Sequence, residues 1–231
     1  MPLGTDCLIP ETILEKLEPL LNEKGIPTTI LPIIPYGTSD EHRSYKGTIS
    51  LSVKTLIDLL TDVGDSCARA GFKKMILFNG HGGNLEILDF MVREIRIRTG
   101  MNVFVIHPFL KIIPESLKLD ENESKYGIHA GQIETSIILN IDSSLVHKEK
   151  YKVSYPESLA GKLHIDLSGK VPFGWATEDL SSSGVIGNPF PSTKEEGDRL
   201  LNEVTAYILD IVQEINEFTD LRSGEEKNKN V

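Results

Sequence analysis

The sequence contains little cysteine and lacks any long apolar run. Its two cysteines, Cys7 and Cys67, lie far apart and form neither a metal-binding nor a redox motif. We therefore expect free thiols in a reducing, cytoplasmic setting. No stretch of the sequence is long and apolar enough to span a bilayer. The pattern of a secretory signal, a basic segment followed by an apolar one, is also missing. These absences argue against a membrane protein and against a disulfide-stabilised secreted domain.

Basic residues are scarce relative to acidic ones. Lys and Arg number 24 against 34 Asp and Glu, which gives a formal net charge of −10 and argues against a nucleic-acid partner. The 231 residues, with 39% hydrophobic and 25% charged content, are typical of one globular α/β domain. We expect that domain to cover residues 1–219, followed by a polar, disordered tail over residues 220–231.

The motif NGHGGN, residues 79–84, is the most informative stretch of the chain. An apolar run over residues 75–78 precedes it and a helical pattern from Leu85 follows it, which indicates strand, loop and helix. In open α/β sheets, ligands bind at the loops that leave the carboxyl ends of strands. His81 would then present a metal ligand or acid–base group there. The alternative is a tight turn with an incidental histidine. The spacing does not match a P-loop or a dinucleotide fingerprint, so a nucleotide-binding module is the poorer interpretation.

The rest of the chain alternates between helical and strand patterns. The order predicts βαβ crossovers and a mainly parallel sheet. Residues 111–127 are expected to be a loop, and residues 145–191 are irregular. The expected helices cover residues 6–25, 52–70, 85–100 and 193–218, and a further helix starts near residue 129 and continues through residues 137–139. The expected strands cover residues 28–34, 75–78 and 102–106.

Four further side chains are candidates for a site. His42 lies in a polar loop after the first expected strand, where it either contacts a substrate or is solvated. His129 and Glu134 lie near the start of a helix, and Glu134 is either a ligand or a complement to the helix dipole. His107 ends the third expected strand, where a structural role is favoured over a catalytic one.

Several motifs occur together in an order that resembles the creatininase (creatinine amidohydrolase) family. They are residues 2–6 (PLGTD), 36–37 (YG), 42, 47–51 (GTISL), 79–84, 129–136 (HAGQIETS) and 184–187 (GVIG). The resemblance implies a doubly wound, three-layer α/β sandwich and a homo-oligomer, commonly a hexamer. It also implies a metal-dependent hydrolase that opens cyclic amides, deformylates formamides or cleaves related ring carbonyl compounds. Members bind a pair of divalent metals, zinc, manganese or iron, bridged by an aspartate.

Carried over by position, the resemblance assigns roles to individual residues. Asp6 matches the bridging carboxylate, His81 a metal ligand and His129 the catalytic imidazole. Glu134 is a candidate ligand of the second metal. We also expect His42 and Gly82 to contact the substrate.

The sequence departs from the family pattern in two places. A Glu-x-His-Gly-Pro-His segment, which supplies two metal ligands, and a strand should precede residues 2–6. We therefore expect a truncated or internal start, and weak metal binding by this chain, because a catalytic zinc usually has three protein ligands. In addition, Gly82 and Gly83 replace a Tyr-Glu pair of creatinine hydrolases, and residues 126–128 replace their Trp-Asp approach to the catalytic histidine. Creatinine is therefore not the favoured substrate.

The leading hypothesis is hydrolysis of a carbon–nitrogen bond in a small cyclic amide or formamide by metal-activated water. One alternative is a family ring hydrolase that acts on a keto-inositol-like carbocycle. The other is a non-catalytic family member that keeps the fold and binds a partner.

Overall fold

The computed structural model describes residues 1–114, 116–162, 164–165, 167, 171 and 173–219. The tail over residues 220–231, expected to be disordered, lies outside this part of the chain.

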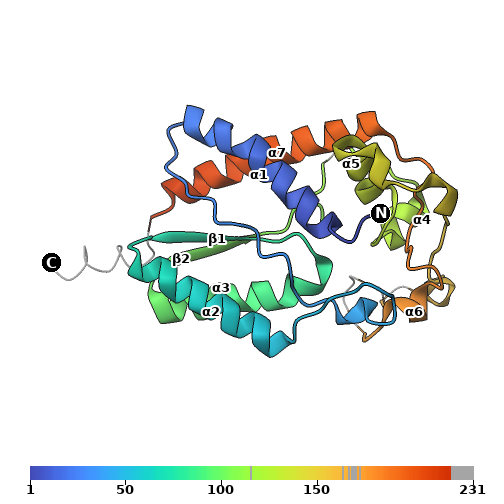
Figure 1. Ribbon diagram of the computed structural model, residues 1–231, viewed down its shortest axis with the longest axis horizontal. Helices are drawn as coiled ribbons and strands as arrows, with labels where there is room; N and C mark the ends of the chain where they lie inside the picture. Colours follow the sequence, from blue (N-terminus) through green and yellow to red (C-terminus); the bar gives the residue numbers. More distant parts are fainter. Residues whose placement is uncertain (115, 163, 166, 168–170, 172, 220–231) are drawn as a thin grey trace, which may run out of the picture.

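The described residues form three layers, with a small parallel sheet between two layers of helices. Strands β1 (Lys74–Phe78) and β2 (Asn102–Ile106) pair in parallel, with Leu77 opposite Val105. Helices α1 (Thr5–Glu23) and α7 (Lys194–Glu217) lie side by side on one face of this sheet, and α2 (Val53–Arg69) and α3 (Leu85–Thr99) cover the other (Figure 1). The expected α/β class, the parallel pairing and the layered arrangement are thus confirmed.

Local signals in the sequence explain where the long helices begin and end. The hydroxyl of Ser52 accepts from the backbone N–H of Thr55 and starts α2, and Thr193 does the same for Glu196 at the start of α7. Helix α1 begins at Thr5 and continues through Pro10 and Pro19 to Glu23.

Shorter elements follow β2. They are α4 (Glu121–Tyr126), α5 (Gln132–Ile141) and α6 (Thr177–Leu180), together with short 3₁₀ turns. Helix α4 corrects the expectation of a loop over residues 111–127. It has six residues, too few to show a 3.6-residue period, and it starts where the Asp120 carboxylate accepts from the N–H of Glu123.

The expected strand over residues 28–34 is not formed. This segment has no regular secondary structure, its backbone makes no hydrogen bond with any other described segment, and Leu31 and Ile34 are 49% and 44% exposed. β-Branched residues favour a pleated, half-buried surface, but a strand also needs a neighbouring backbone to pair with. At β1, the N–H of Asn79 donates to the carbonyl of Ile106, and β2 is its only strand partner within the described ranges.

Two hydrophobic cores hold the layers together. One lies between α1, α5, α7 and β2 and contains the fully buried Ile13, Ile137 and Leu201. The other lies between α2, α3 and the opposite face of the sheet, around Met91 and Ile95. None of the helices in the described residues is long and apolar enough to cross a membrane. The carboxyl ends of β1 and β2 lie at the same end of the sheet, where the loop of residues 79–84 begins.

Candidate active site

The loop after β1 is held in shape by Asn79. This residue is only 2% exposed; its side-chain Nδ2 donates to the carbonyl of His81, and its Oδ1 accepts from the N–H of His81. Asn79 Nδ2 also lies 3.0 Å from His107 Nδ1, whose ring is buried and has Nε2 at 2.9 Å from Asp89. His107 thus supports the loop from below, in agreement with its expected structural role.

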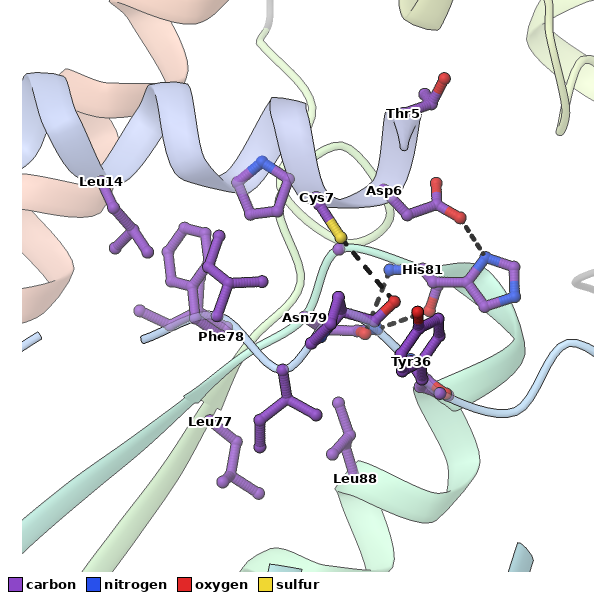
Figure 2. A pocket seen from close by; sticks show the side chains of 18 of the residues that line it. Thr5, Asp6, Cys7, Leu14, Tyr36, Leu77, Phe78, Asn79, His81 and Leu88 are labelled. Carbon is purple, nitrogen blue, oxygen red and sulfur yellow. Dashed lines mark hydrogen bonds and ion pairs between the residues drawn. The ribbon is translucent and has the colours of Figure 1, made fainter. Parts of the chain in front are cut away.

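Gly80 allows the first turn of α1 to lie directly against this loop. A Cβ atom at Gly80 would come within 2.2 Å of the Asp6 carbonyl and 2.9 Å of Pro10 Cγ. The close approach places the Asp6 carboxylate beside the His81 ring, with 3.1 Å between Oδ2 and Nδ1 (Figure 2). The two motifs are 75 positions apart in sequence and are joined by this contact.

Glu41 lies on the opposite side of the His81 ring. It belongs to a 3₁₀ turn, Asp40–His42, and its Oε1 is 2.9 Å from His81 Nε2. The Nε2 atom is buried and has no partner that satisfies hydrogen-bond geometry, despite this short distance. Glu41 carries no motif that predicts a role, although its position next to His42 in a polar loop is a usable signal.

The two carboxylates determine the charge of His81. Burial alone would lower its pKa, but contacts with Asp6 and Glu41 outweigh this and raise the pKa to about 10. Without a metal ion, His81 is therefore an imidazolium held between two anions at neutral pH.

His42 and His129 form a second pair of imidazoles next to His81. Their ring centroids are 4.4 Å apart, and His42 Nδ1 lies 2.8 Å from the hydroxyl of Thr177. The His42 side chain is 15% exposed, so the interpretation as a solvated loop histidine does not hold. Burial lowers the pKa of His129, and burial together with the repulsion that two protonated rings would exert on each other lowers the pKa of His42. Both rings are therefore neutral at pH 7.

Glu134 projects from the first turn of α5 towards His129. Its Oε2 accepts from the N–H of Ala130 at 2.6 Å and lies 3.8 Å from His129 Nδ1. Burial and the nearby charge of Asp6 raise the pKa of Glu134 to about 7. The carboxylate orders the turn before the helix and also faces the catalytic candidate, and its role as a metal ligand stays a prediction.

The structure thus gathers Asp6, His42, His81 and His129 on the wall of one cavity of about 970 Å³, which extends between α1, β1 and α2. Gly82 is exposed, and a Cβ atom there would meet nothing within 4 Å, so the space beside it is open. Thr177 was missed from the sequence, because it lies in the irregular stretch and no motif marks it.

The fit of these residues to a metal ion is partial. Two ligands of one zinc ion, each about 2.1 Å from it, lie roughly 3 to 3.5 Å apart, and the 3.1 Å between Asp6 Oδ2 and His81 Nδ1 matches this spacing. Imidazole and carboxylate donors suit zinc, manganese and iron. However, among the described residues no group of three or more His, Cys, Asp and Glu side chains is arranged to hold one ion.

Curated relatives of the chain are hydrolases. A mycofactocin precursor peptide peptidase of Mycobacterium ulcerans (strain Agy99) is 29% identical over 213 residues, covering 88% of this chain and 75% of the relative. A 3-dehydro-scyllo-inosose hydrolase of Thermotoga maritima is 25% identical over 204 residues, covering 82% and 66%. A creatinine amidohydrolase of Pseudomonas putida is 23% identical over 230 residues, covering 93% and 83%.

Solved structures share the fold. A putative creatinine amidohydrolase from Bacteroides fragilis has a TM-score of 0.77 at 22% identity, covering 93% of this chain and 83% of that one. A creatininase mutant described as Zn-Zn type has a TM-score of 0.66 at 22% identity, covering 91% and 83%.

The match to a family model connects these similarities to the motifs of the site. The creatininase family, described as creatinine amidohydrolase, matches residues 1–212, which contain every residue of the cluster around His81. The chain therefore belongs to the creatininase family of hydrolases.

Proposed function

We propose that this chain hydrolyses a carbon–nitrogen amide bond with a divalent metal ion held by Asp6 and His81. The observation that carries the proposal is the 3.1 Å contact between Asp6 Oδ2 and His81 Nδ1 at the carboxyl end of β1, with His129 on the same cavity wall. A divalent ion, when bound, polarises a carbonyl and acidifies a water molecule.

The residues of the chain supply the proton transfers. His129 is neutral at pH 7 because burial lowers its pKa, so it can accept a proton from water and donate one to the departing nitrogen. Glu134, 3.8 Å from His129 Nδ1, orients that ring and is a second candidate ligand. His42 lies against His129, and we assign it and Gly82 to contacts with the substrate.

Three classes of amide are candidate substrates: peptides, cyclic amides and formamides. The peptidase relative, at 29% identity, supports a peptide amide. The family resemblance supports cyclic amides and formamides. A second candidate reaction is ring opening of a keto-inositol-like carbocycle, which the inosose hydrolase relative supports.

A non-catalytic role is the competing proposal from a different class. It is favoured by one specific observation: no three of the described acidic, histidine and cysteine side chains can hold one ion. A catalytic zinc usually has three protein ligands and a water molecule.

The test combines metal analysis with a substrate panel. The purified chain is stripped with chelator, reloaded separately with zinc, manganese or iron, and assayed against peptide amides, cyclic amides, formamides and keto-inositols. We expect metal uptake and hydrolysis of an amide, both lost in His81→Ala. The matched control is His147→Ala, because His147 is a half-exposed histidine paired with Glu149 at 3.4 Å, away from the site.

Each result decides between the proposals. Metal content that is the same in the wild type and in His81→Ala rejects the assigned ligand. Turnover of a keto-inositol without amide hydrolysis supports the ring hydrolase. A chain that binds no metal and hydrolyses nothing in the panel supports the non-catalytic role.

A further inference from the structure

His81 is contacted on both ring nitrogens by carboxylates from different parts of the chain. Asp6, from α1, lies 3.1 Å from Nδ1, and Glu41, from the 3₁₀ turn of residues 40–42, lies 2.9 Å from Nε2. The two nitrogens of an imidazole point away from each other, so one ion cannot bind His81 together with both carboxylates. In metalloproteins, a histidine that binds a metal through one nitrogen usually donates the other N–H to a carboxylate, which fixes the orientation of the ring.

We propose that Glu41 is the positioning residue of the metal centre: its carboxylate, 2.9 Å from an Nε2 atom that has no other partner, takes up the Nε2–H of His81 when the ion binds and so directs Nδ1 towards Asp6 and the ion. This inference rests on the proposed function, because it assigns a role towards the metal ion that the function requires.

The loop that carries Glu41 is fixed to the loop that carries His81. The N–H and hydroxyl of Thr38 donate to Asn84 Oδ1, and the same hydroxyl lies 2.8 Å from the carbonyl of Gly83. Further along, the Ser50 hydroxyl accepts from the N–H of Ser39 and donates to Asp40. These contacts hold the carboxylate of Glu41 at a set place relative to the imidazole. Its side chain is 19% exposed, so water does not fully screen the contact.

Gly83 leaves the space that Glu41 uses. A Cβ atom at residue 83 would lie 2.7 Å from Glu41 Oε1 and 2.8 Å from both His81 Nε2 and the Thr38 carbonyl. Any side chain there would displace the Glu41 carboxylate or the ring. The position of the Glu41 carboxylate therefore depends on the absence of a side chain at residue 83.

The experiment identifies which nitrogen of His81 binds the metal. Ring nitrogen shifts are recorded by NMR on the chain labelled with ¹⁵N-histidine, before and after addition of zinc, and zinc affinity and stoichiometry are measured by calorimetry. We expect zinc on Nδ1 and a retained proton on Nε2. Glu41→Ala should weaken zinc binding by about 10- to 100-fold with unchanged stoichiometry. Glu41→Gln should restore most of the affinity, because its amide oxygen still accepts the Nε2–H.

Two further variants separate this role from a general effect on folding. Gly83→Ala should weaken zinc binding to a similar degree as Glu41→Ala, because its Cβ displaces the carboxylate. Glu149→Ala removes the carboxylate from the exposed pair with His147 and should leave zinc binding unchanged. Circular dichroism confirms that each variant is folded before its affinity is interpreted.

Three outcomes overturn the inference while leaving the proposed function intact. They are zinc bound at Nε2, a Glu41→Ala affinity equal to that of the wild type, and the loss of one ion per chain in both Glu41 variants, which would make Glu41 a direct ligand. A wild-type chain that takes up no zinc, manganese or iron refutes the proposed function, and the positioning role of Glu41 is rejected with it.

Discussion

Raising the pH of the metal-free chain should destabilise it through His81. The ring has a pKa of about 10 in the folded chain, against 6.5 as its ordinary value. The cause is the pair of carboxylates, Asp6 and Glu41, which lie at its two nitrogens and outweigh the effect of burial. A folded-state pKa above the unfolded one means that the folded chain binds the proton more tightly.

The expected loss of stability follows from the difference between the folded and unfolded pKa values of His81. Stabilisation by the His81 proton is fully present below pH 6.5 and is lost as the pH rises towards 10, at about 1.4 kcal/mol per pH unit and roughly 5 kcal/mol in total. The side chain is only 14% exposed, so solvent screening reduces this figure little. Total stability of a domain is about 5–15 kcal/mol, so the loss should be easily measured.

The assay is urea unfolding of the chelator-treated chain at pH 7.5, 8.5 and 9.5, with His81→Gln as the reference. Measurements start above pH 7 because the proton of Glu134, whose pKa is raised from 4.5 to about 7, also stabilises the fold, and this contribution is lost as the pH rises through that interval. The wild type should lose stability over this range, relative to His81→Gln, and the His81 ring should keep its proton at pH 8 by NMR. A ring that titrates near pH 6.5, or equal pH dependence in the two proteins, would refute the reasoning.

Three further predictions concern the metal and the packing of the fold. Metal uptake at pH 8 should release about one proton per ion, because the ion displaces a proton from His81. Calorimetry in two buffers of different ionisation enthalpy measures the number of protons released, and a value of zero contradicts the assignment of His81 as a ligand. Gly197→Ala should destabilise the chain by about 1–3 kcal/mol in urea unfolding, because a Cβ atom there would lie 2.0 Å from the Ser136 carbonyl where α7 crosses α5. Gly4→Ala is the control because the space around its Cβ is open, and equal stabilities of the two variants would contradict the packing argument. Glu123→Ala should lower the free energy of unfolding by about 3–5 kcal/mol, and Glu123→Gln should lower it less. The reason is that this carboxylate, in a residue only 3% exposed, accepts from the N–H groups of Gln132 and Asn188 and from the Tyr155 hydroxyl. An unfolding midpoint unchanged in both variants would show that these contacts contribute little.

Features with a local cause could be predicted from the sequence. The cap residues Ser52 and Thr193 and the left-handed Gly100 mark helix ends, and the apolar runs before residues 79 and 107 form the two paired strands. The segment of residues 28–34 has the same composition as a strand but makes no ladder, because its state depends on a partner backbone that its own residues cannot specify.

The residues of the site likewise include some that the sequence could predict and some that it could not. Asp6 and His81 could be paired from family order, and the structure places them in contact, although their roles as metal ligands stay predictions. The position of Glu41 could not be predicted, because it depends on how the loop of residues 35–47 folds against Gly83. Similarly, the two interpretations of His42 could be separated only by its burial beside His129 and Thr177.

Within the described residues β1 pairs with a strand on one side only, and this should make hydrogen exchange alternate along the strand. Because Asn79 donates to Ile106 and the direction of the amides reverses at each residue, the N–H groups of Met75 and Leu77 also point to β2. Those of Ile76 and Phe78 point to the other edge, where the cavity lies. Deuterium should therefore enter the even-numbered amides well before the odd-numbered ones, and any molecule that pairs with that edge should slow the even-numbered set alone.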